Sequence, residues 1–445
     1  MGEKITLIGA GLTGPLLATY LAQQGYHVEI FERRQDMRKE VISAGRSINL
    51  AMSVRGIHAL KEVGVYHAIE PLTIPMKGRM IHGLDGSTHL QPYGQREEEV
   101  IYSISRAKLN MELMTLAEKT GKVHIHFNQK CTHVNLEEKK FTVLDKSSSE
   151  EQVLPFELIM GVDGSASAVR DAMTEGGKID SNYKPLDHGY KELTIPPTED
   201  GEFQLEPNAL HIWPRGQFML IALPNMDRSF TCTLFFPMEG DTSFATVNSE
   251  NEITQFFEDY FPDSIPLLSN LVHEFQTNPT GHLGSVYCDP WHVEDSAVIL
   301  GDAAHAVVPF FGQGMNASFQ DCTVLNTLMS EHGGDWQNIL SEFSRIHVKN
   351  GHAIADMALE NYIEMRDKVN DPYYKKCREL ELKMEQFYSS DFIPRYSMVS
   401  FHQMPYSEVY KKGEKQYKIL DKILAEHDPK NVDKELAKTF INGIY

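Results

Sequence analysis

Long apolar runs are missing from this sequence: no stretch approaches the ~20 consecutive apolar residues of a membrane-spanning helix. The N-terminus enters a strand-like run almost at once, which leaves no room for a signal peptide. Basic residues are few beside acidic ones, 42 against 62, and a net charge of −20 would repel phosphates over a broad surface. We therefore expect a cytoplasmic protein that binds neither a membrane nor nucleic acid.

Cysteine is also scarce. The five cysteines are odd in number and scattered, and they form no C-x-x-C pair. This pattern excludes a redox dithiol and a zinc ribbon, and it indicates a reducing compartment. The His124-Ile125-His126 segment would place two imidazoles on one face of a strand, but no third ligand is close in the sequence, so we expect no metal.

The most informative stretch lies at the N-terminus. Residues 5–8 form an apolar, strand-like run that leads into a G-x-G-x-x-G motif and then a helical pattern; its glycines are Gly9, Gly11 and Gly14. Such glycines allow a tight turn, room for a pyrophosphate against bare backbone, and close packing of helix on strand. A second strand at 28–31 ends on Glu32, about 20 residues after the motif, where a ribose-binding acid is expected. This order predicts a dinucleotide-binding domain.

Later segments predict an insertion of a different kind. Residues 75–83 and 90–94 look like short strands, and residues 180–285 alternate between apolar and polar with period two. Buried strands at 156–162 and 297–302 return the chain to the first domain, and the pattern from residue 339 onward is helical. The predicted fold is α/β: a Rossmann-type domain with an inserted, mainly antiparallel β-sheet substrate domain and a C-terminal helical region. The expected boundaries are 1–75, 100–179 and 286–338 for the Rossmann-type domain, 76–99 and 180–285 for the substrate domain, and 339–445 for the helical region.

Three local features are also predicted. Residues 137–140 are expected to form the turn between strands 123–127 and 141–144. Ser53 is expected to cap a helix that runs to about Gly64. The last ~20 residues are charged, and we expect them to lie partly on the surface.

Three motifs occur in a fixed order along the chain: the glycine motif, then Asp163-Gly164, then Gly301-Asp302. This order resembles the single-component flavoprotein hydroxylases. The resemblance implies that Asp302 hydrogen-bonds the ribityl chain of FAD and that Asp163 holds the loop joining the flavin and nicotinamide sites. It also implies that Gly314 begins a helix whose N-terminus points at the flavin pyrimidine ring, where it would stabilise the charge of reduced flavin. Taken singly, both aspartates could also be ordinary turn residues at strand ends.

Longer segments resemble the kynurenine 3-monooxygenase family, from the first strand to about residue 405. These segments are residues 45–51 (GRSINLA), 75–82 (PMKGRMIH), 211–215 (HIWPR), 301–305 (GDAAH), 309–316 (PFFGQGMN), 360–365 (ENYIEM) and 393–398 (IPRYSM). The resemblance implies that bound FAD, NADPH and O2 hydroxylate L-kynurenine to 3-hydroxy-L-kynurenine through a flavin C4a-hydroperoxide. The substrate's own aromatic amine activates its ring, so no catalytic protein base is assigned. Eukaryotic members carry a C-terminal membrane anchor, and residues 407–445 contain none, so the chain resembles the soluble bacterial form.

Site residues follow from the same resemblance. Arg79 would bind the substrate carboxylate, and Tyr93, Asn361 and Tyr396 would complete the cradle for the amino-acid end. A planar guanidinium in an otherwise apolar strand suits a carboxylate, although Arg79 could instead contact flavin phosphates, and the tyrosines could be ordinary core aromatics. The residues implied around FAD, some through backbone atoms only, are Gly9, Gly11, Thr13, Gly14, Phe31, Glu32, Arg33, Arg34, Ala51, Arg106, Cys131, Asp163, Asp302, Gly314, Met315 and Asn316.

Two other functions stay open on the sequence. One is a hydroxylase of another aromatic carboxylic acid, in which Arg79 binds a different carboxylate. The other is a non-catalytic dinucleotide-binding protein of the escort type. A flavin halogenase is disfavoured because the sequence has no W-x-W-x-I-P stretch. The sequence also leaves open whether the protein is a monomer or a homodimer.

Overall fold

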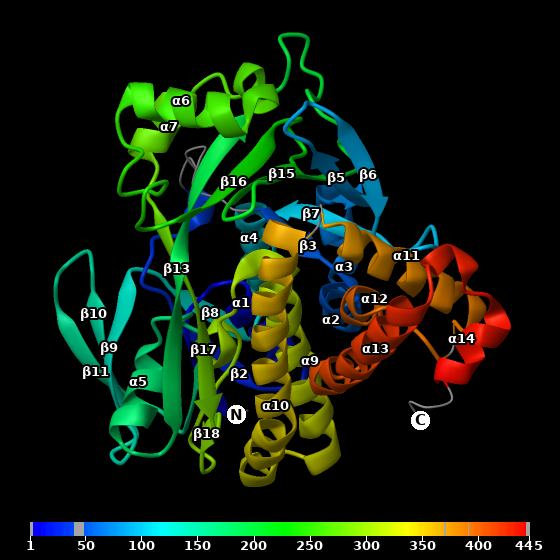
Figure 1. Ribbon diagram of the computed structural model, residues 1–445. Helices are drawn as coiled ribbons and strands as arrows, with labels where there is room; N and C mark the ends of the chain where they lie inside the picture. The colour runs from blue at the N-terminus through cyan, green and yellow to red at the C-terminus, as the bar shows by residue number, and fades with distance from the viewer. Residues whose placement is uncertain (1–2, 40–48, 369–370, 390, 442–445) are drawn as a thin grey trace. The chain divides into compact units, whose positions relative to one another are not determined.

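The structure is a computed structural model that describes residues 3–39, 49–368, 371–389 and 391–441 (Figure 1). The chain divides into two compact units, each assembled from three separate stretches. Unit 1 comprises Met1–Ile74, Tyr102–Leu186 and His282–Ala355, and unit 2 comprises Pro75–Ile101, Asp187–Gly281 and Asp356–Tyr445.

Unit 1 is built on a six-stranded sheet. Its strands are β1 (Lys4–Ile8), β2 (His27–Phe31), β8 (Val123–His126), β12 (Leu158–Gly161), β18 (His292–Val293) and β19 (Ala297–Ile299). They lie in the order β18-β19-β12-β1-β2-β8, and every neighbouring pair is parallel except β18 with β19. Short, largely buried, Val/Ile/Leu-rich strands are typical of a parallel sheet covered on both faces.

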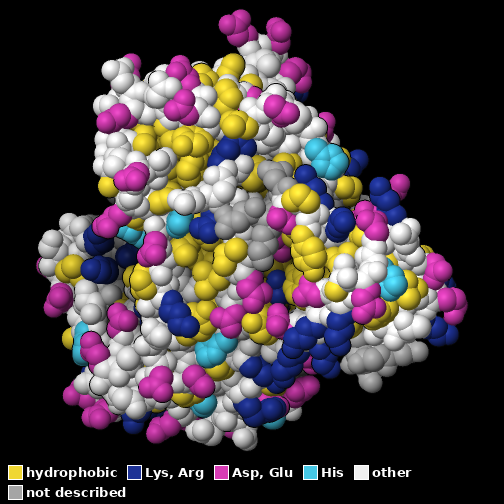
Figure 2. All heavy atoms as spheres, in the orientation of Figure 1, with side chains coloured by type: hydrophobic (Ala, Val, Ile, Leu, Met, Phe, Trp, Pro, Cys, Tyr) yellow, Lys and Arg dark blue, Asp and Glu magenta, His cyan; other side chains and the backbone are white. Residues whose placement is uncertain are grey.

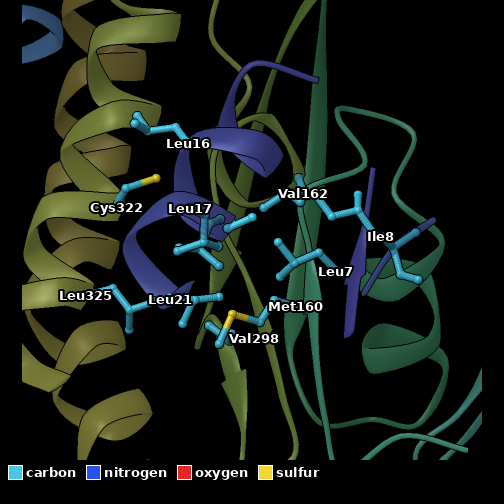
Figure 3. Packing of buried hydrophobic residues seen from close by; sticks show 14 of the residues in the cluster. Leu7, Ile8, Leu16, Leu17, Leu21, Met160, Val162, Val298, Cys322 and Leu325 are labelled. Atoms are coloured by element: carbon cyan, nitrogen blue, oxygen red, sulfur yellow. The ribbon is translucent and has the colours of Figure 1, made fainter. Parts of the chain in front are cut away.

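Helices pack on this sheet, and their packing holds the glycine-rich turn that follows β1. The helices of unit 1 are α1 (Thr13–Gln23), α2 (Val54–Glu62), α3 (Tyr66–Ile69), α4 (Arg106–Lys119), α5 (Ala168–Glu175), α8 (Asp302–His305), α9 (Gly314–His332) and α10 (Trp336–Ile363), the last of which continues into unit 2. Leu17 and Leu21 of α1 lie between the sheet residue Met160 and the α9 residues Cys322 and Leu325, and all five are fully buried (Figure 3). Burying a leucine side chain contributes about 1.5–3 kcal/mol, so α1 and its glycine motif are held firmly against the sheet.

A small second sheet in unit 1 corrects one prediction. It consists of β9 (Gln129–Asn135), β10 (Lys140–Asp145) and β11 (Glu151–Pro155), all antiparallel, in the order β11-β10-β9. The predicted turn at 137–140 therefore joins β9 to β10 and not the strand at 123–127, because β8 belongs to the parallel sheet. A third sheet has the order β3-β7-β4, with strands β3 (Asn49–Met52), β7 (Ile101–Ser105) and β4 (Ile74–Met76).

A seven-stranded sheet contains the strands of unit 2 together with residues 180–186 and 282–289, which belong to unit 1. Its strands are β5 (Gly78–His82), β6 (Thr88–Pro92), β13 (Asp180–Ile195), β14 (Leu210–Pro214), β15 (Met219–Pro224), β16 (Phe230–Pro237) and β17 (Gly281–Asp289), in the order β17-β13-β16-β15-β14-β5-β6. The registered pairs are antiparallel except for β14 with β5. Two helices that the sequence did not predict, α6 (Glu250–Tyr260) and α7 (Leu271–Thr277), bury Phe256 and Phe275 in a core with sheet residues such as Trp213 and Phe236. The predicted α/β fold class is confirmed.

The C-terminal helices are α11 (Pro372–Phe387), α12 (Arg395–Phe401), α13 (Tyr406–Glu426) and α14 (Lys434–Ile441). They share a small apolar core that includes Leu380, Leu420 and Ile441. Of the described residues from 426 to 441, only Pro429, Val432, Ala437 and Ile441 are buried, so this segment lies partly on the surface, as predicted. Basic side chains gather over α13, whose exposed lysines recur at helical spacing: Lys411, Lys415, Lys418 and Lys422 (Figure 2). Across the described residues, no helix combines the length and apolar character needed to span a membrane.

Candidate active site

The carboxyl ends of four adjacent strands carry the residues predicted to hold the cofactor. The glycine motif follows β1, Glu32 follows β2, Asp163 follows β12, and Asp302 follows β19. Because these four strands are parallel, their carboxyl ends meet at one edge of the sheet, which is where open α/β sheets bind ligands. The structure therefore brings together four segments that are far apart in the sequence.

The three glycines of the motif have different surroundings. A Cβ atom on Gly9 would lie 2.6 Å from the carbonyl oxygen of Val162, and one on Gly14 would lie 2.2 Å from the carbonyl oxygen of Gly9. Gly9 also has a φ of +107°, which only glycine adopts readily. A Cβ atom on Gly11 would meet nothing within 4 Å. Gly9 and Gly14 thus serve the fold, whereas Gly11 leaves open space beside the backbone.

Glu32 is buried and closes the turn around the motif. Its Oε2 atom accepts a hydrogen bond from the Ala10 N–H at 2.8 Å, and its Oε1 atom accepts from the N–H and Nε of Arg34, both at 2.9 Å. A carboxylate has about four lone-pair positions, so Glu32 keeps acceptor capacity for a ribose hydroxyl. Arg33 and Arg34 are exposed to solvent.

Asp163 is a buried carboxyl with one unsatisfied oxygen. Burial raises its pKa to about 6, although hydrogen bonds from Ser167 and from the Ala168 N–H, at 2.7 Å, act in the opposite direction. Within the described part of the chain, its Oδ1 atom is buried and has no hydrogen-bond partner. Burial and the charge of Asp163 together raise the pKa of the Cys131 thiol to about 12, so this cysteine is neutral. Asp163 therefore offers an acceptor to a ligand.

Asn316 has a structural task that the sequence did not suggest. Its Oδ1 atom accepts hydrogen bonds from the N–H groups of Ser53, at 2.9 Å, and Gly56, at 3.3 Å, and so caps helix α2. Its Nδ2 atom donates to the carbonyl oxygens of Ala51 and Gly312, both at 2.9 Å. Ser53 is the N-cap residue of α2, as predicted, but its hydroxyl makes no capping hydrogen bond, and the Asn316 amide takes that role. Any contact from Asn316 to a cofactor must come from its backbone.

The remaining predicted cofactor residues also lie in unit 1. Thr13 opens α1, Gly314 and Met315 open α9, Arg106 is an exposed residue at the start of α4, and Phe31 stacks on His126 with ring centroids 4.7 Å apart. The His126 ring is paired with Glu29. Residues 45–48 of the GRSINLA segment lie outside the described residues.

The predicted substrate residues fall in unit 2, and three of them are in contact. Arg79, on β5, is 7% exposed, and its guanidinium carbon lies 4.9 Å from the ring centroid of Tyr396 and 5.7 Å from that of Tyr93. The two tyrosine rings stack with centroids 5.2 Å apart and planes 9° apart. Burial opposes the charge on Arg79, but the tyrosines and nearby Glu364 outweigh it and raise the pKa of the guanidinium. The Nε atom of Arg79 is buried without a hydrogen-bond partner among the residues described.

Asn361, the fourth predicted substrate residue, lies buried near the end of α10. Its Nδ2 atom donates to the Met365 sulfur at 3.2 Å, and the helix changes to a π-helical turn at Glu364–Lys368. Such turns occur frequently at functional sites. Tyr374 on α11 donates from its hydroxyl to Glu364 Oε1 at 2.6 Å, and Arg378, one turn later, donates to the Tyr93 carbonyl oxygen at 3.1 Å. The sequence reasoning missed these two residues, whose only signal was their spacing of four on one helix face.

Comparisons with known proteins agree with this arrangement. The model of a family described as "FAD binding domain" matches residues 3–338. A curated kynurenine 3-monooxygenase from Myxococcus xanthus is 47% identical over 411 residues, which cover 92% of this chain and 88% of that protein. One from Anopheles gambiae is 42% identical, with 94% and 86% covered. The chain belongs to the kynurenine 3-monooxygenase family. As a member it is an FAD-dependent monooxygenase, as predicted, and the escort-protein alternative is wrong.

Solved structures agree in fold. A 2-methyl-3-hydroxypyridine-5-carboxylic acid oxygenase superposes with a TM-score of 0.64 at 18% identity, covering 84% of this chain and 95% of that one. The tetracycline destructase Tet(51) gives a TM-score of 0.60 at 17% identity, with the same shares covered. At these identities the likeness establishes the flavoprotein fold and not the substrate.

Proposed function

We propose that this chain hydroxylates L-kynurenine at ring position 3, giving 3-hydroxy-L-kynurenine, with bound FAD and with NADPH and O2 as co-substrates. The observation that carries the proposal is the buried Arg79 cluster, found in a chain whose close relatives are named for this reaction. A guanidinium with a buried, unpartnered Nε above two stacked tyrosines suits a planar anion such as a carboxylate.

The residues of unit 1 fit a bound dinucleotide. Gly11 leaves space beside the backbone for a pyrophosphate, Asp163 Oδ1 is a buried acceptor still available, and Glu32 can accept from a ribose hydroxyl. The N-terminus of α9 is not capped by a side chain, so its N–H groups and positive dipole end can face an anionic ring. When bound, FAD supplies electron transfer from NADPH to O2 and delivery of one oxygen atom.

The residues of unit 2 bind and orient the substrate. Arg79 pairs with its carboxylate, while the Tyr93 and Tyr396 hydroxyls and the Asn361 amide hydrogen-bond its amino-acid end. Glu364 lies one turn after Asn361, and its carboxylate suits an ammonium group. The aromatic amine of the substrate activates its own ring, so the protein contributes orientation and exclusion of water and needs no base.

A cytoplasmic location is part of the proposal. All five cysteines are free thiols, four of them buried, and this usage suits a reducing compartment. Fractionation of the source cells should recover the activity with the soluble cytoplasmic proteins. Recovery with membranes after a low-salt wash would refute this location.

The reaction itself can be tested on the purified protein. With NADPH, L-kynurenine and isotopically labelled O2, mass spectrometry should detect a product heavier by one labelled oxygen atom, and NADPH should be consumed in proportion. Anthranilate and other aromatic acids without the amino-acid group serve as comparison substrates. Hydroxylation of one of these acids with L-kynurenine left intact would favour the rival function, a hydroxylase of another aromatic carboxylic acid.

A further inference from the structure

A buried cluster in unit 1 has no part in the functions proposed above. Asp321, on α9, is 1% exposed and has three donors around it. Its Oδ2 atom accepts from the Gly301 N–H at 2.8 Å and from His305 Nε2 at 2.6 Å, and its Oδ1 atom lies 3.3 Å from His347 Nδ1. The indole ring of Trp291 stacks on His305 with centroids 4.9 Å apart. One carboxylate thus connects α8, α9 and α10 at the turn that precedes Asp302.

The charges of this cluster are mutually dependent. Burial would raise the pKa of Asp321, but His305 and His347 outweigh it and hold that pKa at about 2. Burial would lower the pKa of His305, but Asp321 and, to a smaller degree, Asp302 outweigh it and raise that pKa. Asp321 is therefore ionised at neutral pH, and its charge favours the protonated form of His305. The charge of Asp302 acts on the same imidazole, so the cluster is coupled to a proposed cofactor residue.

The turn that Asp321 holds has little freedom. Gly301 has φ +59° and ψ −142°, a conformation that side-chain-bearing residues avoid. Its N–H is buried and points to Asp321, and its carbonyl oxygen accepts from the N–H groups of Ala304 and His305, both at 2.9 Å. A Cβ atom on Gly301 would lie 2.9 Å from Thr13 Oγ1. A shift of this peptide would therefore move Asp302, and little space is left for such a shift beside Thr13.

We propose that Asp321 is a positioning residue for FAD: with His305 and His347, it fixes the Gly301 peptide so that Asp302 and Thr13 face the cofactor. The inference rests on the proposed placement of Asp302 beside FAD. Without the carboxylate, the buried Gly301 N–H and two imidazole N–H groups lose their acceptor, and the turn must move to satisfy them. Outer residues that orient direct ligands typically account for 10–100-fold in affinity at metal sites, and we expect a similar effect on FAD binding.

The central experiment replaces Asp321 with Asn, which keeps the shape and removes the charge. Asp321→Asn should raise the Kd of FAD, measured by flavin fluorescence on reconstituting the apoprotein, by about 10–100-fold at pH 7. Ile339→Ala is the matched control, because this residue is fully buried on α10, about two turns before His347, and belongs neither to the cluster nor to the proposed cofactor residues. This variant should lose thermal stability, but its Kd of FAD should stay within about threefold of the wild-type value. Should Asp321→Asn and Ile339→Ala weaken FAD binding equally, Asp321 would be merely structural and the proposal wrong.

Two further readouts separate positioning from folding. A histidine whose pKa is raised in the folded protein stabilises the fold below about pH 6.5. This stabilisation is lost as the pH rises through the pKa of the folded state. The wild-type Kd of FAD should therefore rise at alkaline pH. This rise should be absent in Asp321→Asn, where His305 has no nearby charge of equal strength.

If Asp321→Asn does not fold, His347→Gln replaces it. The Kd of FAD should then rise by about two- to tenfold, equivalent to one ordinary hydrogen bond. An unchanged Kd in whichever variant folds would overturn the proposal.

A double-mutant cycle distinguishes this inference from the proposed cofactor site. Asp302→Ala alone tests that site: an unchanged FAD Kd would remove Asp302 from it, whatever Asp321 does. If Asp302→Ala weakens binding, Asp321→Asn added to it should cost much less than it costs in the wild type, because Asp321 acts through Asp302. Full additivity would mean that Asp321 acts elsewhere.

Discussion

Arg79 is the residue proposed to bind the substrate carboxylate, and its replacement gives the sharpest prediction. The guanidinium is 7% exposed, lies 4.9 Å from the Tyr396 ring centroid, and has a buried Nε with no partner among the described residues. Arg79→Ala would leave the substrate carboxylate in the same site without a counter-charge. Arg79→Lys restores a positive charge but not the planar fork that binds a carboxylate through two parallel bonds.

The expected size of the effect follows from the burial of this charge. Truncating one partner of a buried, hydrogen-bonded charge pair typically costs about 2–5 kcal/mol, which is roughly 30- to 5,000-fold in affinity. Arg79→Ala should raise the Kd of L-kynurenine by a factor in this range, measured from the change in flavin absorbance on titration. Arg79→Lys should recover only part of the loss. FAD content should stay near one per chain, because the proposed cofactor residues lie in unit 1 and Arg79 lies in unit 2.

Two controls make the result specific to the carboxylate. Decarboxylated kynurenine lacks the group that Arg79 is proposed to bind, so its affinity should be similar in wild type and Arg79→Ala. Arg215→Ala removes another partly buried arginine of unit 2, which donates to the carbonyl oxygens of His82 and Tyr260, and it should leave the Kd of L-kynurenine nearly unchanged. Loss of flavin from Arg79→Ala with unchanged kynurenine affinity would place Arg79 in the cofactor site and refute the reasoning.

Three other predictions follow from the structure. Gly11→Val should fold with a normal unfolding midpoint but bind no FAD, since its side chain enters open space beside the backbone; retained flavin would contradict the assignment. Burial opposes ionisation of Asp263, but hydrogen bonds from His82 and Trp213 outweigh it and lower its pKa. Its contribution to stability is therefore present above about pH 4 and lost as pH falls further. Trp213→Phe should lower the free energy of unfolding in urea by about 1.5–3 kcal/mol at pH 7 and by less at pH 3, and a pH-independent difference would be inconsistent with this. Flavin reduction by NADPH should be slow until L-kynurenine occupies the site bearing Asn361 and Tyr396, and equal stopped-flow rates without substrate would argue against such control.

The cofactor domain could be predicted from the sequence because its signals are local. A buried strand, a glycine turn and a helix occupy consecutive residues, and the buried strands β12 and β19 are each followed within three residues by an aspartate motif. The strand β9 was missed because only Cys131 and Val134 are buried along it and its pairing with β10 contains a register shift after Thr142. The helix α6 was missed although its capping box, Ser249 with Glu252, is readable in the sequence. The period-two pattern of the surrounding strands outweighed this signal.

The proposed substrate cluster could not be assembled from local patterns. Arg79, Tyr93 and Tyr396 come from a strand, a loop and a helix, and their stacking depends on the tertiary fold. A guanidinium in an otherwise apolar strand was a local signal for Arg79, but only the family resemblance joined it to the two tyrosines. Resemblance also has a limit, which Asn316 illustrates: it implied a residue beside the cofactor, but the amide is fully used in capping α2. A sequence motif identifies a position near the cofactor, but it does not tell whether the side chain or the backbone of that residue contacts the cofactor.

The two proposed sites differ in what they require of the sequence. The cofactor edge consists largely of strand ends, N–H groups and glycine turns, that is, of backbone geometry. Backbone geometry tolerates extensive substitution, and the fold is indeed shared with solved structures only 17–18% identical to this chain. The substrate cluster consists of side chains from unit 2 that must be a guanidinium, two stacked phenols and an amide. Substitutions in that cluster should therefore change which aromatic acid is hydroxylated while the flavin stays bound, and this separation is what the Arg79 series measures.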